Sequence, residues 1–298
     1  MSAATELNNV PDVPIDATRR TRAWLSAFRT PAGVVGVILM LIVLVVALLS
    51  LFGLTPYDPA HQNVADSLKS PGSGHLFGTD QFGRDIFSRV SSGLANSLRI
   101  AIVSVAAAAI SGTVLGVLGG YYQGIVDRIV GVVTNVLFAF PSLLLALALA
   151  ATLKRNWLTV SLSIAIVYLP IFARVARGPV LTLRSADYVL ASTAIGRSRF
   201  STLFEHVLPN MRGILVVQIT LSLSWAILTE ASLSFLGFGT PPPAASLGGM
   251  VYDAQTLSSV APWMLLFPGI ALIVAVIGLN LLGDSLRAAL DPRTGGRR

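Results

Sequence analysis

Apolar runs, separated by short charged stretches, occupy most of the chain. Six of these runs carry no charge and approach the roughly 20 helical residues that the hydrocarbon core of a bilayer requires. They cover residues 31–57, 100–126, 129–153, 156–173, 213–229 and 262–283. The pattern predicts an all-α integral membrane protein with six transmembrane helices, and an even number of crossings places both termini on one side.

Two of the uncharged stretches admit another interpretation. Residues 231–252 contain three consecutive prolines and several glycines, which would leave backbone groups unpaired in lipid, so we expect a re-entrant or surface segment there. The first run, 31–57, could be a secretory signal because arginines precede it. Its apolar core is longer than that of a signal and no small-residue cleavage pattern follows, which favours a retained helix.

The distribution of arginine predicts the orientation. Arginines gather before the first run, between the fourth and fifth runs, and after the sixth, whereas residues 230–262 contain no lysine or arginine. By the positive-inside rule the arginine-rich segments face the cytoplasm, although Lys154 and Arg155 then lie outside. The expected organisation is a cytoplasmic tail (1–30), a first helix (31–57), an extracytoplasmic segment (58–98), a five-helix core (99–283) with a cytoplasmic loop (184–210) and a second extracytoplasmic segment (231–261), and a cytoplasmic tail (284–298).

The two extracytoplasmic segments are long enough to suggest a function. Loops of thirty to forty residues without one are uncommon, so an external partner or an outer gate is expected, with plain connectors as the alternative. The first segment contains Asp80, Gly83, Arg84 and Asp85. These residues form either a salt-bridged turn or a contact with that partner or gate.

Composition excludes several classes of protein. Only 12% of the 298 residues are charged, against about 25% in soluble domains, and the net charge of +7 is spread in short blocks, which argues against a nucleic-acid partner. Cysteine is absent, and both lysines, Lys69 and Lys154, follow leucine, so no phosphate-binding loop of the GxxxxGK[ST] type exists. There is no GxSxG or HExxH motif either. We therefore expect no catalytic residue, metal site or cofactor in this chain.

The interiors of the runs lack the ionisable groups on which coupled transporters usually depend. Glu230 and Asp284 stand at the ends of runs, where we expect them in water. The energy for any transport should then enter from another protein.

The loop 184–210 contains two short amphipathic stretches on either side of Gly196. The first has its stripe at Tyr188, Ala191, Ser192 and Ile195, and the second at Phe200, Leu203, Phe204, Val207 and Leu208. This spacing predicts a helix–turn–helix in which Gly196 stops the first helix, Ser198 caps the second and Pro209 ends it. The stripes either pack on the ends of the chain's own helices or dock into another protein.

The same loop resembles the EAA loop of inner-membrane permeases of ATP-binding-cassette (ABC) importers. Leu190-Ala191-Ser192, Gly196 and His206-Val207-Leu208-Pro209 keep the spacing of that motif, with the substitutions usual in its peptide branch. Further blocks that resemble this branch lie at 75–98, 119–148, 234–243 and 280–293. The resemblance is to the second permease of dipeptide and oligopeptide importers, a group that includes nickel and glutathione importers.

The resemblance implies a type I ABC importer permease in the bacterial inner membrane. Its expected partners are a second permease in a heterodimer, two ATPase subunits that bind ATP and Mg, an extracytoplasmic substrate-binding protein, and membrane lipid. A coupling helix at about 186–195 would dock into the ATPase. The coupling residues implied are Asp187, Tyr188, Ala191, Ser192, Ala194, Gly196, Arg197, His206 and Pro209.

Within the loop, several roles stay open. Asp187 either pairs with a cation of the ATPase or favours the helix N-terminus through the dipole. Arg197 and Arg199 face either the ATPase or lipid phosphate. His206 is expected to be structural, between helix and bundle, with a regulatory role as the alternative.

Two features of the helices are also open. Gly112, Gly116 and Gly120 form a smooth face that meets either this chain's own bundle, which we favour, or the partner permease. Pro141 should kink the third helix, either to line the transport path or as a static bend.

The rival functions are a stand-alone secondary transporter or channel, a membrane enzyme, and a scaffold.

Overall fold

The computed structural model describes residues 30–72 and 74–290, which form helices joined by turns and irregular segments, with one isolated bridge between Thr79 and Asp85. Most of both predicted tails, residues 1–29 and 291–298, therefore lie outside the described residues. The long helices are α2 (Pro31–Leu51), α3 (Ile86–Tyr122), α4 (Gly124–Ala139), α5 (Ser142–Thr152), α6 (Trp157–Leu183), α9 (Leu208–Phe235) and α11 (Trp263–Leu290). The short ones are η1 (Val64–Asp66), α7 (Asp187–Ala194), α8 (Arg199–Thr202), the π-turn η2 (Leu203–Val207), α10 (Leu247–Ala254) and η3 (Gln255–Leu257).

Five of these helices are long and apolar enough to cross a membrane: α2, α3, α6, α11, and α9 together with the turns before it. The pair α4 and α5 makes a sixth crossing if it counts as one bent span. The described residues thus form the predicted all-α membrane bundle. Residues 231–252, which we expected not to span, contain the end of α9 and the short α10 with an irregular connection between them.

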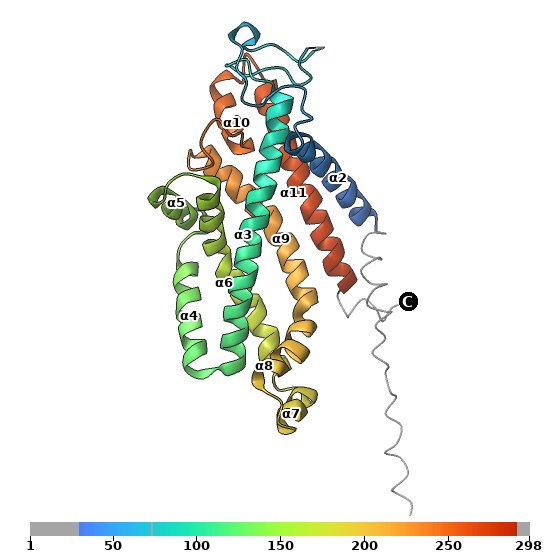
Figure 1. The fold of residues 1–298 in the computed structure, drawn as a ribbon, viewed down its shortest axis with the longest axis vertical. Helices are drawn as coiled ribbons and strands as arrows, with labels where there is room; N and C mark the ends of the chain where they lie inside the picture. The colour runs from blue at the N-terminus through green and yellow to red at the C-terminus, as the bar shows by residue number, and fades with distance from the viewer. Residues whose placement is uncertain (1–29, 73, 291–298) are drawn as a thin grey trace, which may run out of the picture.

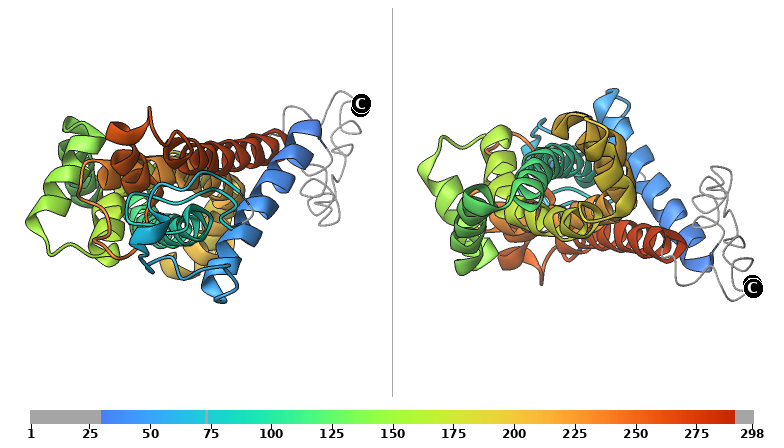
Figure 2. Two further views of the ribbon diagram at one scale, coloured as in Figure 1. Left: turned by 90° about the horizontal axis from the view of Figure 1, so that it is seen from above. Right: turned by 90° about the horizontal axis from the view of Figure 1, so that it is seen from below.

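The helices are arranged around α3 and α6, which pack along one another (Figure 1). Seen along the long axis of the molecule, α4 and α5 lie on one side of this centre, and α2 and α11 extend to the other (Figure 2). The helix α7 lies at one end of the long axis, whereas α10 and the segment between α2 and α3 lie at the opposite end (Figure 1).

The close approach of α3 to α6 depends on the glycine stripe. A Cβ atom added at Gly112 would lie 2.4 Å from the carbonyl oxygen of Leu169, and one added at Gly116 would lie 2.2 Å from that of Ala173. Both distances are far inside van der Waals contact, so only glycine lets the two backbones meet. The interpretation that the stripe faces this chain's own bundle is confirmed.

The kink expected at Pro141 is present and is sharper than a bent helix. α4 and α5 meet at 93°, so the third predicted span, over 129–153, consists of two helices on either side of the bend. The residue before a proline is restricted to the extended region, and Phe140 adopts it with ψ of 139°. Pro141 then starts α5 in a new direction.

Helices also extend beyond the uncharged runs. α3 begins at Ile86, well inside the predicted segment 58–98, and α6 continues to Leu183, past its predicted end at 173. Arg174 and Arg177 interrupt the apolar run without ending the helix, because long cationic side chains turn aside to polar or aromatic partners. The guanidinium of Arg174 lies 4.1 Å from the centre of the Phe138 ring.

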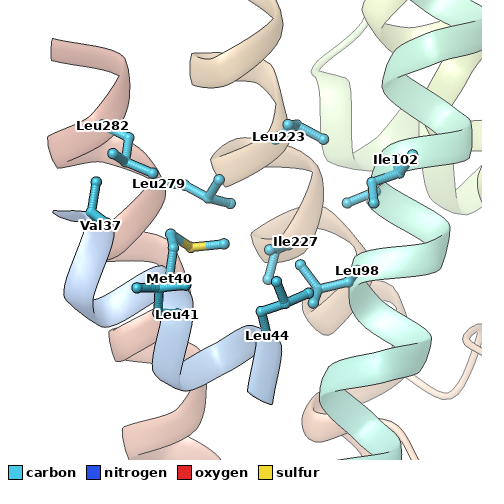
Figure 3. A pocket seen from close by; sticks show the side chains of 11 residues that line it. Val37, Met40, Leu41, Leu44, Leu98, Ile102, Leu223, Ile227, Leu279 and Leu282 are labelled. Atoms are coloured by element: carbon cyan, nitrogen blue, oxygen red, sulfur yellow. The ribbon is translucent and has the colours of Figure 1, made fainter. Parts of the chain in front are cut away.

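A cavity of about 310 Å³ lies between α2, α3, α9 and α11 (Figure 3). All of its lining residues are hydrophobic: Val37, Met40, Leu41, Leu44, Leu98, Ala101, Ile102, Leu223, Ile227, Leu279 and Leu282. Such a lining offers no polar group that could orient a polar substrate.

Candidate coupling site

The loop between α6 and α9 folds as the predicted helix–turn–helix. α7 begins after Ala186, and it ends where Gly196 adopts φ of +84°. The N–H of Gly196 donates to the oxygen of Thr193 (3.1 Å) and the N–H of Arg197 to that of Ser192 (3.2 Å). This pair of bonds is the Schellman arrangement, which requires a residue in the left-handed region and so favours glycine. The predicted helix at 186–195 and its stop at Gly196 are confirmed.

The second helix is capped as predicted but does not end at Pro209. The Ser198 hydroxyl accepts from the N–H of Ser201 at 3.1 Å. From Arg199 the chain then stays helical to Phe235, so the predicted boundary at Pro209 is wrong. A proline cannot donate to the carbonyl four residues earlier, and the π-turn Leu203–Val207 widens the helix just before it.

The loop has an inner side, which packs on the ends of its own helices. Val189 and Ser192 of α7 are buried, and the Ser192 hydroxyl lies 3.3 Å from that of Thr202 in α8. Leu203 and Val207 join a buried cluster with residues of α3 and α6. The interpretation that the stripe packs on its own bundle therefore holds for this side of the loop.

The opposite side, which we call the coupling face, is exposed and largely apolar. It consists of Tyr188, Leu190, Ala191, Ala194, Ile195, Phe200 and Phe204. Contiguous exposed apolar groups mark interaction sites on soluble surfaces, and α7, which carries most of these residues, lies at one end of the long axis (Figure 1). It is available to another molecule in this conformation.

Charged residues of the loop mostly have partners within the chain. Arg197 forms an ion pair with Glu205, and the Ser201 hydroxyl donates to the same carboxylate at 2.8 Å. Glu205 is absent from the residues predicted for this site; it follows Arg197 by eight positions and lies in the π-turn. Asp187 is exposed in the first turn of α7, where a negative charge favours the helix dipole.

His206 lies between α7 and the start of α9, as the structural interpretation expects. Its ring meets that of Tyr188 edge-on, with centres 6.0 Å apart. The Asn210 amide donates to the His206 carbonyl at 2.6 Å and to the Tyr188 hydroxyl at 3.3 Å. These contacts hold α7 against the long helix, and a regulatory role of His206 stays a prediction.

At the opposite end of the molecule, Asp80 and Arg84 form the salt-bridged turn. The Arg84 Nε donates to Asp80 Oδ2 at 2.6 Å, and the N–H groups of Phe82 and Arg84 donate to Oδ1. Gly83 has φ of +71°, and a Cβ there would lie 1.8 Å from the Asn63 oxygen. Asp80 and Arg84 are buried, so in this conformation their side chains hold the turn.

Asp85 completes this outer cluster. Its carboxylate caps α3 by accepting from the N–H and hydroxyl of Ser88, and His75 Nδ1 lies 2.9 Å from its other oxygen. Burial raises the pKa of Asp253 in α10, an effect that nearby Arg84 and other cations oppose. A contact of these residues with an external partner stays a prediction. Among the described residues, no group of three histidine or acidic side chains could hold a metal ion.

Glu230 departs most from its expected environment. Its side chain is 0% exposed, so the expectation that it lies in water is wrong, whereas Asp284 is exposed. The Ser97 hydroxyl of α3 donates to Glu230 Oε2 at 2.6 Å, and the Ser234 hydroxyl donates to Oε1 at 2.7 Å. A buried carboxyl is stable only with such donors, and the bond from Ser97 ties α9 to α3.

Replacing Glu230 with alanine should therefore destabilise the protein. The Ser97 and Ser234 hydroxyls would lose their acceptor in a buried site, which costs about 1–3 kcal/mol of unfolding free energy. Glu230→Gln keeps one acceptor oxygen and nearly the same volume, and we expect a smaller loss. Thermal unfolding of the detergent-solubilised variants measures these losses of stability. Equal unfolding midpoints for Glu230→Ala and Glu230→Gln would contradict the expected difference.

Taken together, the described residues form a multi-helix membrane bundle with a projecting helix–turn–helix. The chain belongs to the family described as binding-protein-dependent transport system inner membrane component, whose model matches residues 112–296. It is a permease subunit of the ATP-driven importer type.

Named relatives cover most of the chain. It is 40% identical to the dipeptide transport system permease protein DppC of Alkalihalophilus pseudofirmus over 240 residues. The match covers 80% of this chain and 79% of the relative. It is 41% identical over 241 residues to the glutathione transport system permease protein GsiD of Pectobacterium atrosepticum, which covers 80% of each. A probable D,D-dipeptide permease of Escherichia coli, DdpC, is 38% identical and covers 82% of each chain.

Solved structures support the fold. The inward-facing MetNI methionine ABC transporter matches with a TM-score of 0.56 and 18% identity, over 67% of this chain and 96% of that one. An amino acid ABC transporter with histidines matches with a TM-score of 0.51 and 14% identity, over 66% and 91% of the two chains. At these identities the likeness concerns the fold alone.

Proposed function

We propose that this chain forms half of the transport path of a bacterial inner-membrane importer for short peptides. In the proposed complex it pairs with a distinct second permease and binds one of two ATPase subunits through the coupling face. A substrate-binding protein delivers substrate to the opposite end. The chain itself catalyses nothing, and ATP and Mg are bound by the ATPases.

The observation that carries the proposal is the exposed coupling face. A bundle of this kind lacks a source of energy, and ATP hydrolysis elsewhere can shift its conformation only through contacts that differ between two states. α7 offers such a contact because its inner side is fixed to α8 and the π-turn while its outer side is free in this chain. The short peptide as substrate is supported by the relatives, which are named for dipeptides, D,D-dipeptides and glutathione.

Reconstitution tests this function directly. In proteoliposomes that hold both permeases, the ATPases and the binding protein, labelled dipeptide should accumulate only when ATP is supplied. This chain reconstituted by itself should give no uptake. Uptake by the single chain, driven by an ion gradient, would instead identify a stand-alone secondary transporter. Uptake of Ni²⁺ in place of dipeptide or glutathione would contradict the proposed substrate.

A further inference from the structure

The turn between α3 and α4 lies at the same end of the bundle as α7 (Figure 1). It is short, because α3 ends at Tyr122 and α4 begins at Gly124. Gln123 and Gly124 both have positive φ, of +55° and +60°, and the N–H of Gln123 donates to the oxygen of Gly119 at 3.0 Å. The two helices are therefore joined by a tight connection and not by a slack loop.

An ion pair holds this connection to α6. The Nε of Arg177 donates to Asp127 Oδ1 at 2.6 Å, and its Nη2 donates to Oδ2 at 2.7 Å. This two-bond geometry fixes the relative orientation of the two side chains as well as their separation. Asp127 lies in the first turn of α4, so the pair sets the position of that helix end against α6.

Two further arginines, one before α7 in the chain and one after it, contact the connection between α3 and α4. Arg184, at the C-terminus of α6, donates from Nη1 to the Tyr121 oxygen at 3.2 Å. The Arg199 guanidinium lies 6.0 Å from the centre of the Tyr122 ring. Arg184 precedes α7 by three residues, and Arg199 begins the helix that follows it. Residues that precede and follow α7 in the chain therefore both contact the α3–α4 connection.

The helix α4, whose first turn the pair holds, has a smaller buried share than α2 and few buried residues of its own. In α4 only Val130 and Thr134 are buried, and the helix ends at the 93° bend before α5. Few internal contacts oppose a tilt of α4 about that bend. A displacement at its first turn is therefore passed along the helix to Pro141.

We propose that Asp127 and Arg177 are positioning residues that transmit movement of α7 to α4 and so to the bend at Pro141. This inference rests on the proposed function, since it assumes that an ATPase moves α7. The pair is only partly buried, with 24% and 42% of the two side chains exposed. Because neither side chain is fully buried, loss of one partner leaves no buried charge unpaired, and the substitution should impair coupling without preventing folding.

The test measures peptide molecules transported per ATP hydrolysed in the reconstituted complete importer. Asp127→Asn and Arg177→Gln should each lower this ratio about five- to tenfold, in the range of ordinary coupling energies, while the ATPases still co-purify. Arg177→Lys keeps the charge but loses the two-bond geometry, and an intermediate ratio is expected. The exchanged pair Asp127→Arg with Arg177→Asp should recover much of the ratio.

Arg128→Gln is the matched control, because it removes a charge of the same kind from an exposed position of α4 next to Asp127. It should leave the ratio unchanged. Wild-type ratios in both single variants would overturn the proposal, and so would two impaired single variants that the exchange fails to rescue. Failure of the proposed function looks different, because the wild-type chain would then bind no ATPase at all.

Discussion

Gly116→Leu should prevent α3 and α6 from packing and so abolish a stable, monodisperse protein. Even the first side-chain atom would meet the Ala173 carbonyl oxygen at 2.2 Å, and a backbone atom cannot turn aside as a flexible side chain can. Gly116→Ala should lower the free energy of unfolding by about 1–3 kcal/mol, as overpacking commonly does. Thermal unfolding followed by size-exclusion chromatography in detergent measures both effects.

Gly131 supplies the control for that experiment. It lies in α4, and a Cβ added there meets nothing within 4 Å. Gly131→Ala should be neutral or slightly stabilising, since alanine has the higher helix propensity by about 1 kcal/mol. If Gly116→Ala and Gly131→Ala unfold at the same temperature, the glycine stripe is not what sets the distance between α3 and α6.

Gly196→Arg should leave the protein folded in the membrane but reduce ATP-driven uptake about tenfold or more, a coupling loss of ordinary size. A Cβ at Gly196 meets nothing within 4 Å, so the stem of the new side chain clashes with nothing in this chain. The substitution would instead place a bulky cation beside the coupling face. Uptake and co-purification of the ATPases are the measurements, and normal values for both would contradict the assignment of α7 as the coupling helix.

The strain of a non-glycine residue in the left-handed region needs a separate control. Gly237 has φ of +85°, ends α9 with the same Schellman hydrogen bonds, and likewise leaves an added Cβ with no neighbour within 4 Å. Gly237→Arg should cost a similar amount of stability, about 1–2 kcal/mol. Because it lies at the other end of the molecule, it should leave co-purification of the ATPases unchanged.

Features set by a few neighbouring residues could be predicted from the sequence. The stop at Gly196 and the cap at Ser198 depend on backbone chemistry within four residues, and both are confirmed. The same local reasoning is wrong at Pro209, because a π-turn lets the helix continue past the proline. Local rules describe the usual helix end and do not foresee this adjustment.

Features set by the packing of distant segments could not be predicted in this way. Glu230 stands at the edge of an apolar run, which says nothing of the Ser97 hydroxyl that faces it from α3. Asp127 and Arg177 are separated by 50 residues, and their pairing needs the antiparallel placement of α4 and α6. The sequence pattern leaves open whether Arg197 faces the ATPase or lipid, whereas in the structure this residue pairs with Glu205 of the π-turn.

The helix α3 runs without a break for 37 residues, a length of about 55 Å at 1.5 Å per residue. Asp85 fastens its first turn into the external charge cluster, and its last residues carry the connection that Arg184 and Arg199 touch. A stiff rod of this kind cannot tilt at one end alone. The two ends of the bundle therefore move together, so in the proposed complex a contact made at one end can alter the ATPase contact at the other through α3 alone.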